Sequence, residues 1–485
     1  MTAGHAKRND SSGVLTAAAV DLGATSGRVL VGRVGTDELS VREVARFANE
    51  PMRDQAGVLR WDLETLWREI GAGVRTAVVE HGATSVAVDS WAVDYGLVRN
   101  GRLLGAPASY RDGRTDGVSE GVAERLDWNE HFAITGIARL PFNTVYQLLT
   151  EPEDVLSSST MLLMPDLLVW CMTGNIGTER TNASTTALYD LGTGNWSAEI
   201  CSRLGIPMSV LPPIAEPGSV AGQIAPAVLR EWGLPDDLDV TVVRAASHDT
   251  ASAVIAVPAE DTATAYVSCG TWSLVGQELL TPVLTAEARN SRFTNEVGID
   301  HTIRFLRNVT GLWLLSQSLE AWRDQGLDVR RDDVLAEAAD LEPDRYLIDA
   351  ESEALVAPGN MPARIVAQVD GPERPSTPAE ITRCIIDSLA HGHARNVQRV
   401  AELSGTVPEK VHIVGGGSAN ALLCKATATA ARLPVEAGPV EATAIGNLVV
   451  QARAAGVLLT GEHGRRQARL LVRATQSLVA YDPEP

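Results

Sequence analysis

Two stretches of the chain share a pattern in which apolar, strand-forming residues flank a short polar turn. Residues 17–32 read AAAVDLGATSGRVLVG, and residues 265–276 read AYVSCGTWSLVG. The pattern predicts two β-hairpins, and Gly23 and Gly27 in the first lack a Cβ, so an anion can approach their backbone closely. Two such hairpins, each opening one half of a long chain, indicate duplicated α/β domains that face each other across a nucleotide. On these stretches alone, a pair of ordinary β-hairpins is the alternative.

A helix and a buried strand are predicted after the first hairpin. Apolar residues at helical spacing indicate a helix within residues 61–78, with Asp62 as its N-cap. A strand entering at residue 85 delivers Asp89 at its carboxyl end, followed by Trp91. Because ligands bind outside the carboxyl ends of strands in open α/β sheets, this segment is a candidate wall of a site. The alternative is that Asp89 only caps or turns the chain. Short helices are expected around residues 161–173.

The second half repeats the alternation of strands and helices. A strand leads into Ser247-His248-Asp249-Thr250, and a helix of small residues follows. Thr377, Pro378 and Glu380 form a capping-box pattern, which predicts a helix that runs to about Gly405. A buried strand, the three glycines Gly415, Gly416 and Gly417 and another helix come next. Helix N-termini after glycine loops bind anions and nucleotides, although a tight turn against another domain would also select glycines.

Length and charge restrict the classes of function. The 485 residues suggest two or three domains, and the formal net charge of −20 disfavours attraction to nucleic acid or to anionic lipid. The 5 cysteines form no Cys-x-x-Cys pair, which fits a reducing cytoplasm and argues against a structural zinc site. The polar first dozen residues lack the apolar core of a signal peptide, and no apolar run reaches the roughly 20 residues that cross a bilayer. We therefore expect a cytoplasmic protein with no membrane or nucleic-acid partner.

Asp249 is the strongest candidate for proton chemistry. It follows a strand where the two halves of the chain join, and a carboxylate there could accept the proton of a substrate hydroxyl that attacks phosphorus. His248 could assist, although a lone histidine is more often a hydrogen-bonded structural group. Asp21, which ends the first strand, could hold Mg²⁺ through water, or could be a turn residue. No Walker A, Rossmann or protein-kinase motif is present, so a bound nucleotide requires a different cradle.

Together, these segments resemble the FGGY carbohydrate kinase family, within the actin-like ATPase superfamily. The motifs run in the expected order over about residues 20–450: VDLGATSGR, DSWAVDYGL, SYRDGRTD, LPFNTVYQL, MPDLL, TNASTT, SHDTASAV, SCGTWSL, FTNE, RFLRNVTGLWLL, VGGGSAN and AGPVEATAIGNL. Each motif is weak alone, but the set is highly specific. The resemblance implies an α/β fold of two ribonuclease-H-like domains, as in actin, hexokinase and Hsp70, with an active cleft between them, ATP as phosphoryl donor and Mg²⁺ as metal.

The resemblance also implies roles for individual residues. Asp249 is the expected catalytic base and Asp21 the expected water-mediated Mg²⁺ contact. The expected sugar contacts are Ala92, His248, Asp249, Thr250 and Asn308. The expected nucleotide contacts are Ala24, Thr25, Ser26, Gly27, Arg28, Gly270, Thr271, Gly415, Gly416 and Gly417. We expect a flexible tail over 1–13, a sugar-binding domain over 14–257, a nucleotide-binding domain over 258–475 and a C-terminal tail over 476–485, in a monomer or homodimer.

The expected activity is phosphorylation of the 1-hydroxyl of L-rhamnulose by ATP, with another ketose such as L-fuculose as the alternative. Ala92, Val297 and Ser316 stand where the family commonly has glycine, glycine and glutamine, which leaves the sugar less certain than the reaction. A nonenzymatic ATP-binding switch or a sugar-sensing regulator is the alternative from another class. A DNA-binding regulator would carry a basic helix-turn-helix extension, and none precedes residue 14 or follows residue 475 in this sequence.

Overall fold

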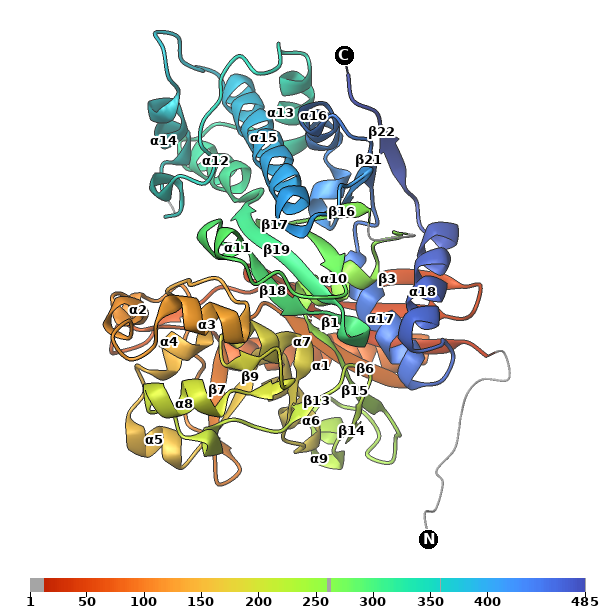
Figure 1. Ribbon diagram of the computed structural model, residues 1–485. Helices are drawn as coiled ribbons and strands as arrows, with labels where there is room; N and C mark the ends of the chain where they lie inside the picture. Colours follow the sequence, from red (N-terminus) through yellow and green to blue (C-terminus); the bar gives the residue numbers. More distant parts are fainter. Residues whose placement is uncertain (1–12, 260–262, 358, 485) are drawn as a thin grey trace. The chain divides into compact units, whose positions relative to one another are not determined.

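The computed structural model describes residues 13–259, 263–357 and 359–484 and divides into two compact units (Figure 1). Unit 1 comprises Met1–Pro258, Leu280–Arg304 and Thr443–Thr475, and unit 2 comprises Ala259–Leu279, Phe305–Ala442 and Gln476–Pro485. The sequence suggested one cut between residues 257 and 258, whereas each unit is assembled from separate segments. Of the predicted tail over 1–13, only Gly13 lies within the described residues.

Unit 1 is built on a six-stranded sheet of order β14-β15-β6-β1-β2-β3. Its strands are β1 (Leu15–Leu22), β2 (Ser26–Val34), β3 (Leu39–Ala48), β6 (Ser85–Ser90), β14 (Val220–Gln223) and β15 (Thr241–His248). The first hairpin is confirmed, because β1 and β2 pair antiparallel on either side of residues 23–25. Strands β1, β6 and β15 run parallel to one another, so their carboxyl ends meet at one edge of the sheet.

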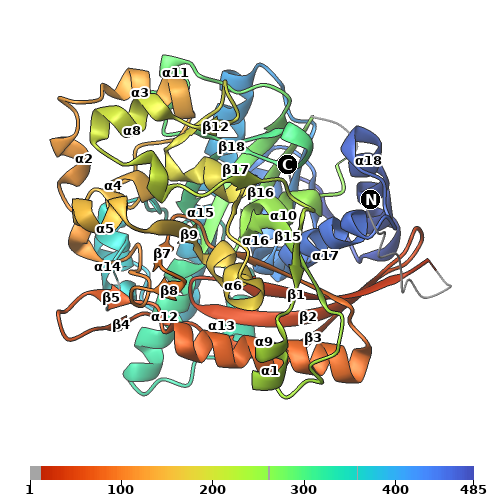
Figure 2. The ribbon, with the colours of Figure 1, turned by 90° about the horizontal axis from the view of Figure 1, so that it is seen from below.

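Helix α1 (Leu63–His81) covers one face of this sheet, and Figure 2 shows it running alongside β1, β2 and β3. The predicted cap is confirmed, because the Asp62 side chain accepts a hydrogen bond from the backbone N–H of Thr65. Leu66, Ile70 and Val74 recur at helical spacing and are buried in the same core cluster as apolar residues of β1, β2 and β6. The apolar stripe of the sequence therefore explains how this helix packs.

Helix α17 (Ala442–Ala454) contacts the sheet through one leucine and two amide side chains. A Cβ on Gly32 of β2 would lie 2.3 Å from Leu448, so glycine is what lets that leucine approach the strand. Gln451 donates a hydrogen bond to the carbonyl of Ala18 in β1, and Asn447 donates to the carbonyl of Ala87 in β6. These contacts bring a segment near the end of the chain onto the first strands.

The other helices of unit 1 are mostly short. They are α2 (Val118–Gly121), α3 (Trp128–Thr135), α4 (Thr144–Leu148), α5 (Glu153–Ser157), α6 (Met164–Thr173), α7 (Arg180–Ala183), α8 (Ala198–Leu204), α9 (Pro226–Glu231), α10 (Asp249–Ile255), α11 (Ala286–Asn290) and α18 (Gly461–Thr475). The helix expected around 161–173 begins only at Met164, because residues 160–163 form β9, which pairs with β7 (Tyr95–Arg99). Two further short strands are β10 (Thr178–Glu179) and β18 (Thr294–Val297).

Unit 2 has its own sheet, in which the strand order is β19-β17-β16-β20-β21-β22. The strands are β16 (Thr264–Cys269), β17 (Trp272–Leu279), β19 (Ile303–Thr310), which begins at the boundary with unit 1, β20 (Lys410–Val414), β21 (Val435–Ala437) and β22 (Val479–Tyr481). The second predicted hairpin is confirmed as antiparallel β16 and β17, and β16 runs parallel to β20. Part of the segment expected to be a C-terminal tail, residues 479–481, instead pairs antiparallel with β21, whose edge it covers.

Five helices pack around this second sheet. They are α12 (Trp313–Asp324), α13 (Arg331–Ala339), α14 (Met361–Gln368), α15 (Pro378–Ser404) and α16 (Ala421–Ala431). The predicted capping box is confirmed at the start of α15, where Thr377 and Glu380 satisfy each other's backbone N–H groups, and the helix ends at Gly405. In Figure 1 α15 is the long helix of this unit, and it packs against α16, α13 and β17.

Candidate functional site

Three carboxylates meet where the parallel strands of unit 1 end. Asp21 lies opposite Asp89 in the register of β1 and β6. His248 lies opposite Ser90 in the register of β15 and β6, and Asp249 follows directly as the first residue of α10. The strand ends predicted to form a site are thus brought to one edge of the sheet, with Asp21 and Asp249 each close enough to Asp89 to raise its pKa.

Asp89 is fully buried, and one of its two oxygens has no partner. Its Oδ2 accepts a hydrogen bond of 2.6 Å from Nδ2 of Asn447, whereas its Oδ1 accepts none within the described part of the chain. Burial, together with the charge of Asp21, raises the pKa of Asp89 well above its ordinary value. The structure therefore gives Asp89 no capping or turn contact, and leaves a buried acceptor atom that needs a partner.

Asp21 is buried at the base of the first hairpin and pairs with Arg28 across it. The turn itself is fixed by backbone bonds, because the N–H of Gly23 donates to Ser26 and Nδ2 of Asn49 donates to the carbonyl of Gly23 at 2.7 Å. Thr25 is exposed at the tip. Asn49 was not found from the sequence, since it lies beyond β3 and reaches the turn only through the sheet.

The residues present fit a hydrated divalent cation beside Asp21 and Asp89. Magnesium prefers oxygen ligands and keeps several water molecules, and the unpartnered Oδ1 of Asp89 is the kind of acceptor that such water would satisfy. Within the described residues, no group of three or more His, Cys, Asp or Glu side chains is arranged to hold a metal ion directly. A water-mediated contact through Asp21 therefore remains the prediction for this ion.

Asp249 has one oxygen held and one oxygen open. Its Oδ1 accepts hydrogen bonds from Thr250, at 2.5 Å from the backbone N–H and 3.0 Å from the hydroxyl, and lies 3.4 Å from Nε2 of His248. Its Oδ2 has no partner among the described residues, and its side chain is 32% exposed. Desolvation by the surrounding protein raises the pKa of Asp249, with His248 opposing this rise and Asp21 adding to it. This geometry suits a carboxylate that accepts a proton at Oδ2.

Glu179 holds the strand end that presents Asp249, a role that the sequence did not suggest. Its carboxylate accepts hydrogen bonds from the backbone N–H and hydroxyl of Ser247, at 2.8 and 3.0 Å. It also accepts from the N–H and hydroxyl of Thr181 at the start of α7. Glu179 is completely buried, and this burial raises its pKa. A Ser-His-Asp-Thr segment next to a buried Glu could be recognised only once β10 and β15 were placed together.

The loop after β6 is held in a strained conformation. Val93 has φ 71°, a conformation that is unfavourable for a β-branched residue. Its carbonyl accepts hydrogen bonds from Thr144 and Gln147, at 2.8 and 3.3 Å, which keep the loop in place. Ala92, the expected sugar contact, directly precedes this residue and is partly exposed. Backbone strain of this kind is concentrated at functional sites, so this loop is compatible with the predicted role of Ala92 as a sugar contact.

Asp94 holds the same loop in place through hydrogen bonds. It accepts hydrogen bonds from Nε1 of Trp61 and Trp91, at 2.7 and 3.0 Å, and from the N–H of Tyr110 and the amide of Gln147. Burial raises the pKa of Asp94 to about 6, although these four donors oppose the rise. The two indole rings lie 4.2 Å apart, so the tryptophan of the Asp-Ser-Trp motif is a packing residue.

In unit 2 the structure brings the second hairpin and the three glycines together. Strands β16 and β20 pair up to Ser268 and Val414, which lie two residues before Gly270 and one residue before Gly415. A Cβ on Gly417 would lie 2.3 Å from the sulfur of Cys269, so the two loops are in contact. The N-terminus of α12 also lies at this hairpin, because Leu312 and Trp313 donate backbone hydrogen bonds to Gly270 and Thr271. These contacts place the hairpin turn, the glycine loop and the start of α12 close together, which is compatible with one ligand that touches all three.

Three further residues named in the sequence analysis lie on strands or helices and not in these loops. Asn308 is exposed on β19, and Ser316 is exposed on α12. Val297, at the end of β18 in unit 1, is buried and does not have a positive φ, so the backbone there does not require the glycine that the family commonly has.

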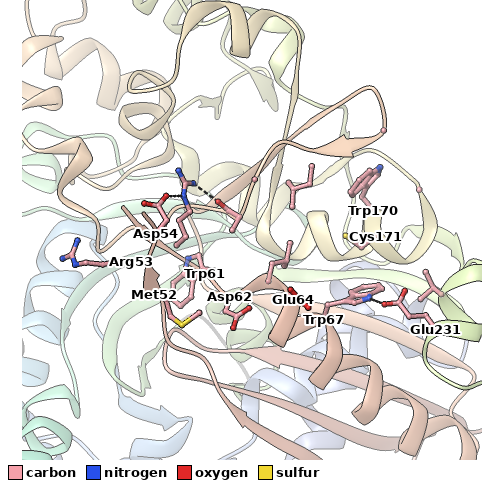
Figure 3. A pocket seen from close by; sticks show the side chains of 18 residues that line it. Met52, Arg53, Asp54, Trp61, Asp62, Glu64, Trp67, Trp170, Cys171 and Glu231 are labelled. Atoms are coloured by element: carbon pink, nitrogen blue, oxygen red, sulfur yellow. Dashed lines mark hydrogen bonds and ion pairs between the residues drawn. The ribbon is translucent and has the colours of Figure 1, made fainter. Parts of the chain in front are cut away.

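Unit 1 also carries an open groove of about 1100 Å³, shown in Figure 3. Its lining includes Trp67, whose indole donates a hydrogen bond to Glu231, together with Trp170 and the ion pair of Asp54 and Arg60. No residue predicted for catalysis or binding lines it. The groove is therefore separate from the carboxylates at the strand ends.

Two general expectations can be compared with the described residues. All five cysteines are free thiols in the structure. No described helix is both long enough and apolar enough to span a membrane.

Known proteins resemble this chain over nearly its whole length. The FGGY family of carbohydrate kinases matches through its N-terminal domain at residues 16–256 and its C-terminal domain at residues 265–455. A rhamnulokinase of Enterococcus faecalis is 38% identical over 451 residues, 91% of this chain and 89% of that protein. A rhamnulokinase of Klebsiella pneumoniae is 38% identical over 478 residues, 96% of this chain and 94% of that protein.

Solved structures of sugar kinases share the fold. Ligand-bound xylulose kinase from Lactobacillus acidophilus has a TM-score of 0.79 at 16% identity, over 97% of this chain and 94% of that one. Plasmodium falciparum glycerol kinase with ADP has a TM-score of 0.78 at 15% identity, over the same shares of the two chains, 97% and 94%. These likenesses establish the two-domain kinase fold. With both family domains matched along most of the sequence, the chain belongs to the FGGY family of carbohydrate kinases.

Proposed function

We propose that this carbohydrate kinase transfers the γ-phosphoryl group of ATP to the 1-hydroxyl of L-rhamnulose, giving L-rhamnulose 1-phosphate and ADP in L-rhamnose catabolism. The relatives that are 38% identical over about nine tenths of the chain are rhamnulokinases. The observation that carries the proposal is Asp249, whose contacts among the described residues are all made by Oδ1, which leaves Oδ2 open. We place the reaction in the cytoplasm, in a monomer or homodimer.

Asp249 acts as the general base in this proposal. Its Oδ2 accepts the proton of the sugar 1-hydroxyl as the hydroxyl oxygen bonds to the γ-phosphorus and the bond from phosphorus to the ADP oxygen breaks. Thr250 holds Oδ1 through two hydrogen bonds, so that the carboxylate cannot rotate freely, and Nε2 of His248 lies 3.4 Å from the same oxygen. A raised pKa makes the carboxylate a better proton acceptor than an ordinary aspartate, but also lets it become protonated at higher pH than an ordinary aspartate.

The two hairpins and the glycine loop are the proposed ATP contacts. Ala24, Thr25, Ser26, Gly27 and Arg28 follow β1 in unit 1, and Gly270, Thr271, Gly415, Gly416 and Gly417 cluster in unit 2. Backbone N–H groups in such turns bind phosphate oxygens. Mg²⁺ bound through water at Asp21, with Oδ1 of Asp89 nearby, would neutralise charge on the phosphates.

The proposed sugar contacts are Ala92, His248, Thr250 and Asn308, besides Asp249. The strained turn at Val93 and its anchor Asp94 fix the position of Ala92, which supports a rigid wall there. The methyl group of Ala92 narrows the sugar pocket compared with the glycine that the family commonly has. Selectivity between L-rhamnulose and L-fuculose is therefore expected to depend on this loop.

A coupled ADP-release assay over a panel of ketoses tests the proposal. Sugar-stimulated turnover that is highest with L-rhamnulose is expected, whereas flat basal ATP hydrolysis would refute kinase activity and preference for L-fuculose would refute the substrate. Asp249→Asn should lower kcat about 10²- to 10⁴-fold while ATP still binds. Asp62→Asn is the matched control, because asparagine caps a helix as well as aspartate does and activity should not change. Activity of Asp249→Asn within a few-fold of wild type would remove Asp249 from the mechanism.

A further inference from the structure

A buried arginine and glutamate lie behind His248, on the side away from Asp249. Arg304 of β19 is completely buried, and its Nη1 lies 3.2 Å from Nδ1 of His248. Glu296 of β18 is also buried, with Oε2 2.8 Å from Nη1 of Arg304 and 3.1 Å from Nδ1 of His248. All of these residues belong to unit 1. They form a chain of contacts from Arg304 through His248 to Asp249.

The donors in this chain determine where the imidazole proton sits. A guanidinium has only N–H donors, so the aligned contact from Nη1 of Arg304 requires an unprotonated Nδ1 on His248. The ring proton opposite this contact then sits on Nε2, which lies 3.4 Å from Oδ1 of Asp249. Oε2 of Glu296 lies 3.1 Å from the same Nδ1 and is the competing partner, because the opposite tautomer would direct an Nδ1 proton at this carboxylate.

Glu296 balances the buried charge of Arg304. Although burial alone would raise its pKa, Arg304 and His248 together lower the pKa of Glu296, so that it is a carboxylate at neutral pH. The guanidinium is also fixed in place, because its Nε and Nη2 both donate to the carbonyl of Val297 at 3.3 Å. An unbalanced charge at this depth would be costly, and the pair avoids that cost.

We propose that Arg304 and Glu296 are positioning residues for phosphoryl transfer. Arg304 keeps the proton of His248 on Nε2, this N–H faces Oδ1 of Asp249 at 3.4 Å, and Oδ2 is left as the proton acceptor. Glu296 balances the charge of Arg304. The inference rests on the proposed role of Asp249, but it concerns which of the two oxygens acts and what holds the other.

Two variants with opposite expected effects test the proposal. Arg304→Met removes the donor and its positive charge, so kcat should fall about 10- to 100-fold and the acidic limb of the kcat/KM profile should move to higher pH. Glu296→Gln keeps the shape of the side chain but leaves the charge of Arg304 unbalanced, so the same limb should move to lower pH. KM for ATP should change little in either variant. The other ionisable groups facing Asp249 and its strand, namely Asp21, Asp89, Arg28 and Glu179, are the same in both.

A matched control separates positioning from simple loss of stability. Arg383 is also paired with a carboxylate and backbone carbonyls, namely Asp387 and the carbonyls of Ala338 and Leu341. Its side chain is 12% exposed, and it contacts no predicted site residue. Arg383→Met should lower the unfolding midpoint without moving the pH profile. Folded Arg304→Met and Glu296→Gln with wild-type pH profiles, or with shifts in the same direction, would overturn the proposal.

The tautomer can also be measured in the unaltered protein. The ¹⁵N shifts of His248, assigned by comparison with His248→Asn, should show that Nε2 carries a proton and that Nδ1 does not. A proton on Nδ1 would overturn the inference even if neither variant folds. Failure of the proposed function can be told apart from failure of this inference. Inactivity on every ketose, or an active Asp249→Asn variant, would refute the function but would not change the ¹⁵N shifts of His248.

Discussion

Gly446 in α17 packs directly on the helix that presents Asp249. A Cβ at this position would lie 1.8 Å from the carbonyl oxygen of Ser252 and 2.6 Å from its carbonyl carbon, in the middle of α10. Both atoms belong to the backbone, so no side chain can rotate to make room. The Gly446→Ala variant must therefore separate α17 from α10.

The size of the effect follows from the distances. Moving the new Cβ from 1.8 Å to an ordinary contact of 3.4 Å requires a displacement of about 1.6 Å. Overpacking of a core lowers the free energy of unfolding by about 1–3 kcal/mol, and a new clash with backbone atoms belongs at the upper end of this range or beyond. Alanine is more favourable in a helix than glycine by about 1 kcal/mol, so the net loss of stability should be about 2 kcal/mol. Because α10 begins at Asp249, a shift of this size should also lower kcat by about 10²-fold.

Chemical unfolding followed by tryptophan fluorescence, together with ADP release, measures both effects. Gly392→Ala in α15 is the control, because that glycine is also helical and buried but a Cβ there has nothing within 4 Å. The control should be as stable as wild type or about 1 kcal/mol more stable, with unchanged activity. Wild-type stability and turnover in Gly446→Ala would show that the two helices are not packed as the structure has them.

Three further results are expected. Asp249 must be ionised to accept a proton, and its pKa is raised. As pH is lowered, kcat/KM should therefore begin to fall at a higher pH than it would for an ordinary aspartate, whose pKa is about 3.9. A flat profile down to pH 4 would contradict this. Thr377→Ala removes the cap of α15 and should cost about 1 kcal/mol in chemical unfolding with no change in activity. Trp61→Phe removes a hydrogen-bond donor to Asp94 and should raise its pKa above the present value of about 6. The free energy of unfolding should fall by about 1–3 kcal/mol, and this loss should grow as pH increases, because the ionised carboxylate is the form that needs the donor. Equal losses at pH 5 and pH 8 would argue against this role.

The local elements could be predicted because their signals lie within short segments. Each hairpin is defined by a turn between two strand-forming runs, and the start of α15 is defined by Thr377 and Glu380 only three residues apart. The position of Asp249 at a strand end was likewise predictable from the buried run before it. From the parallel order of strands, these local facts also place Asp21 and Asp89 side by side.

Contacts between distant segments could not be predicted in the same way. Asn447 and Gln451 lie one helical turn apart, but nothing in the sequence indicates that they bond to Asp89 and to the carbonyl of Ala18. Glu296 reaches His248 because β18 packs on α7, which packs on β15, and Arg304 reaches the same ring from the start of β19. A buried polar residue finds its partner through the tertiary fold, so the sequence shows the group without showing its bond.

The glycines of the predicted nucleotide contacts show why a motif alone does not assign a role. Gly27 is required by packing, since a Cβ would lie 2.2 Å from the ring of Phe47, and Gly417 is required by Cys269 in the same way. Gly415 has φ 79°, which favours glycine whatever it binds. Gly416 has no positive φ and nothing within 4 Å of a Cβ, so no described contact accounts for glycine there. Packing and backbone conformation therefore explain two of the three consecutive glycines without a ligand, and Gly416 is the one for which nucleotide contact stays the prediction.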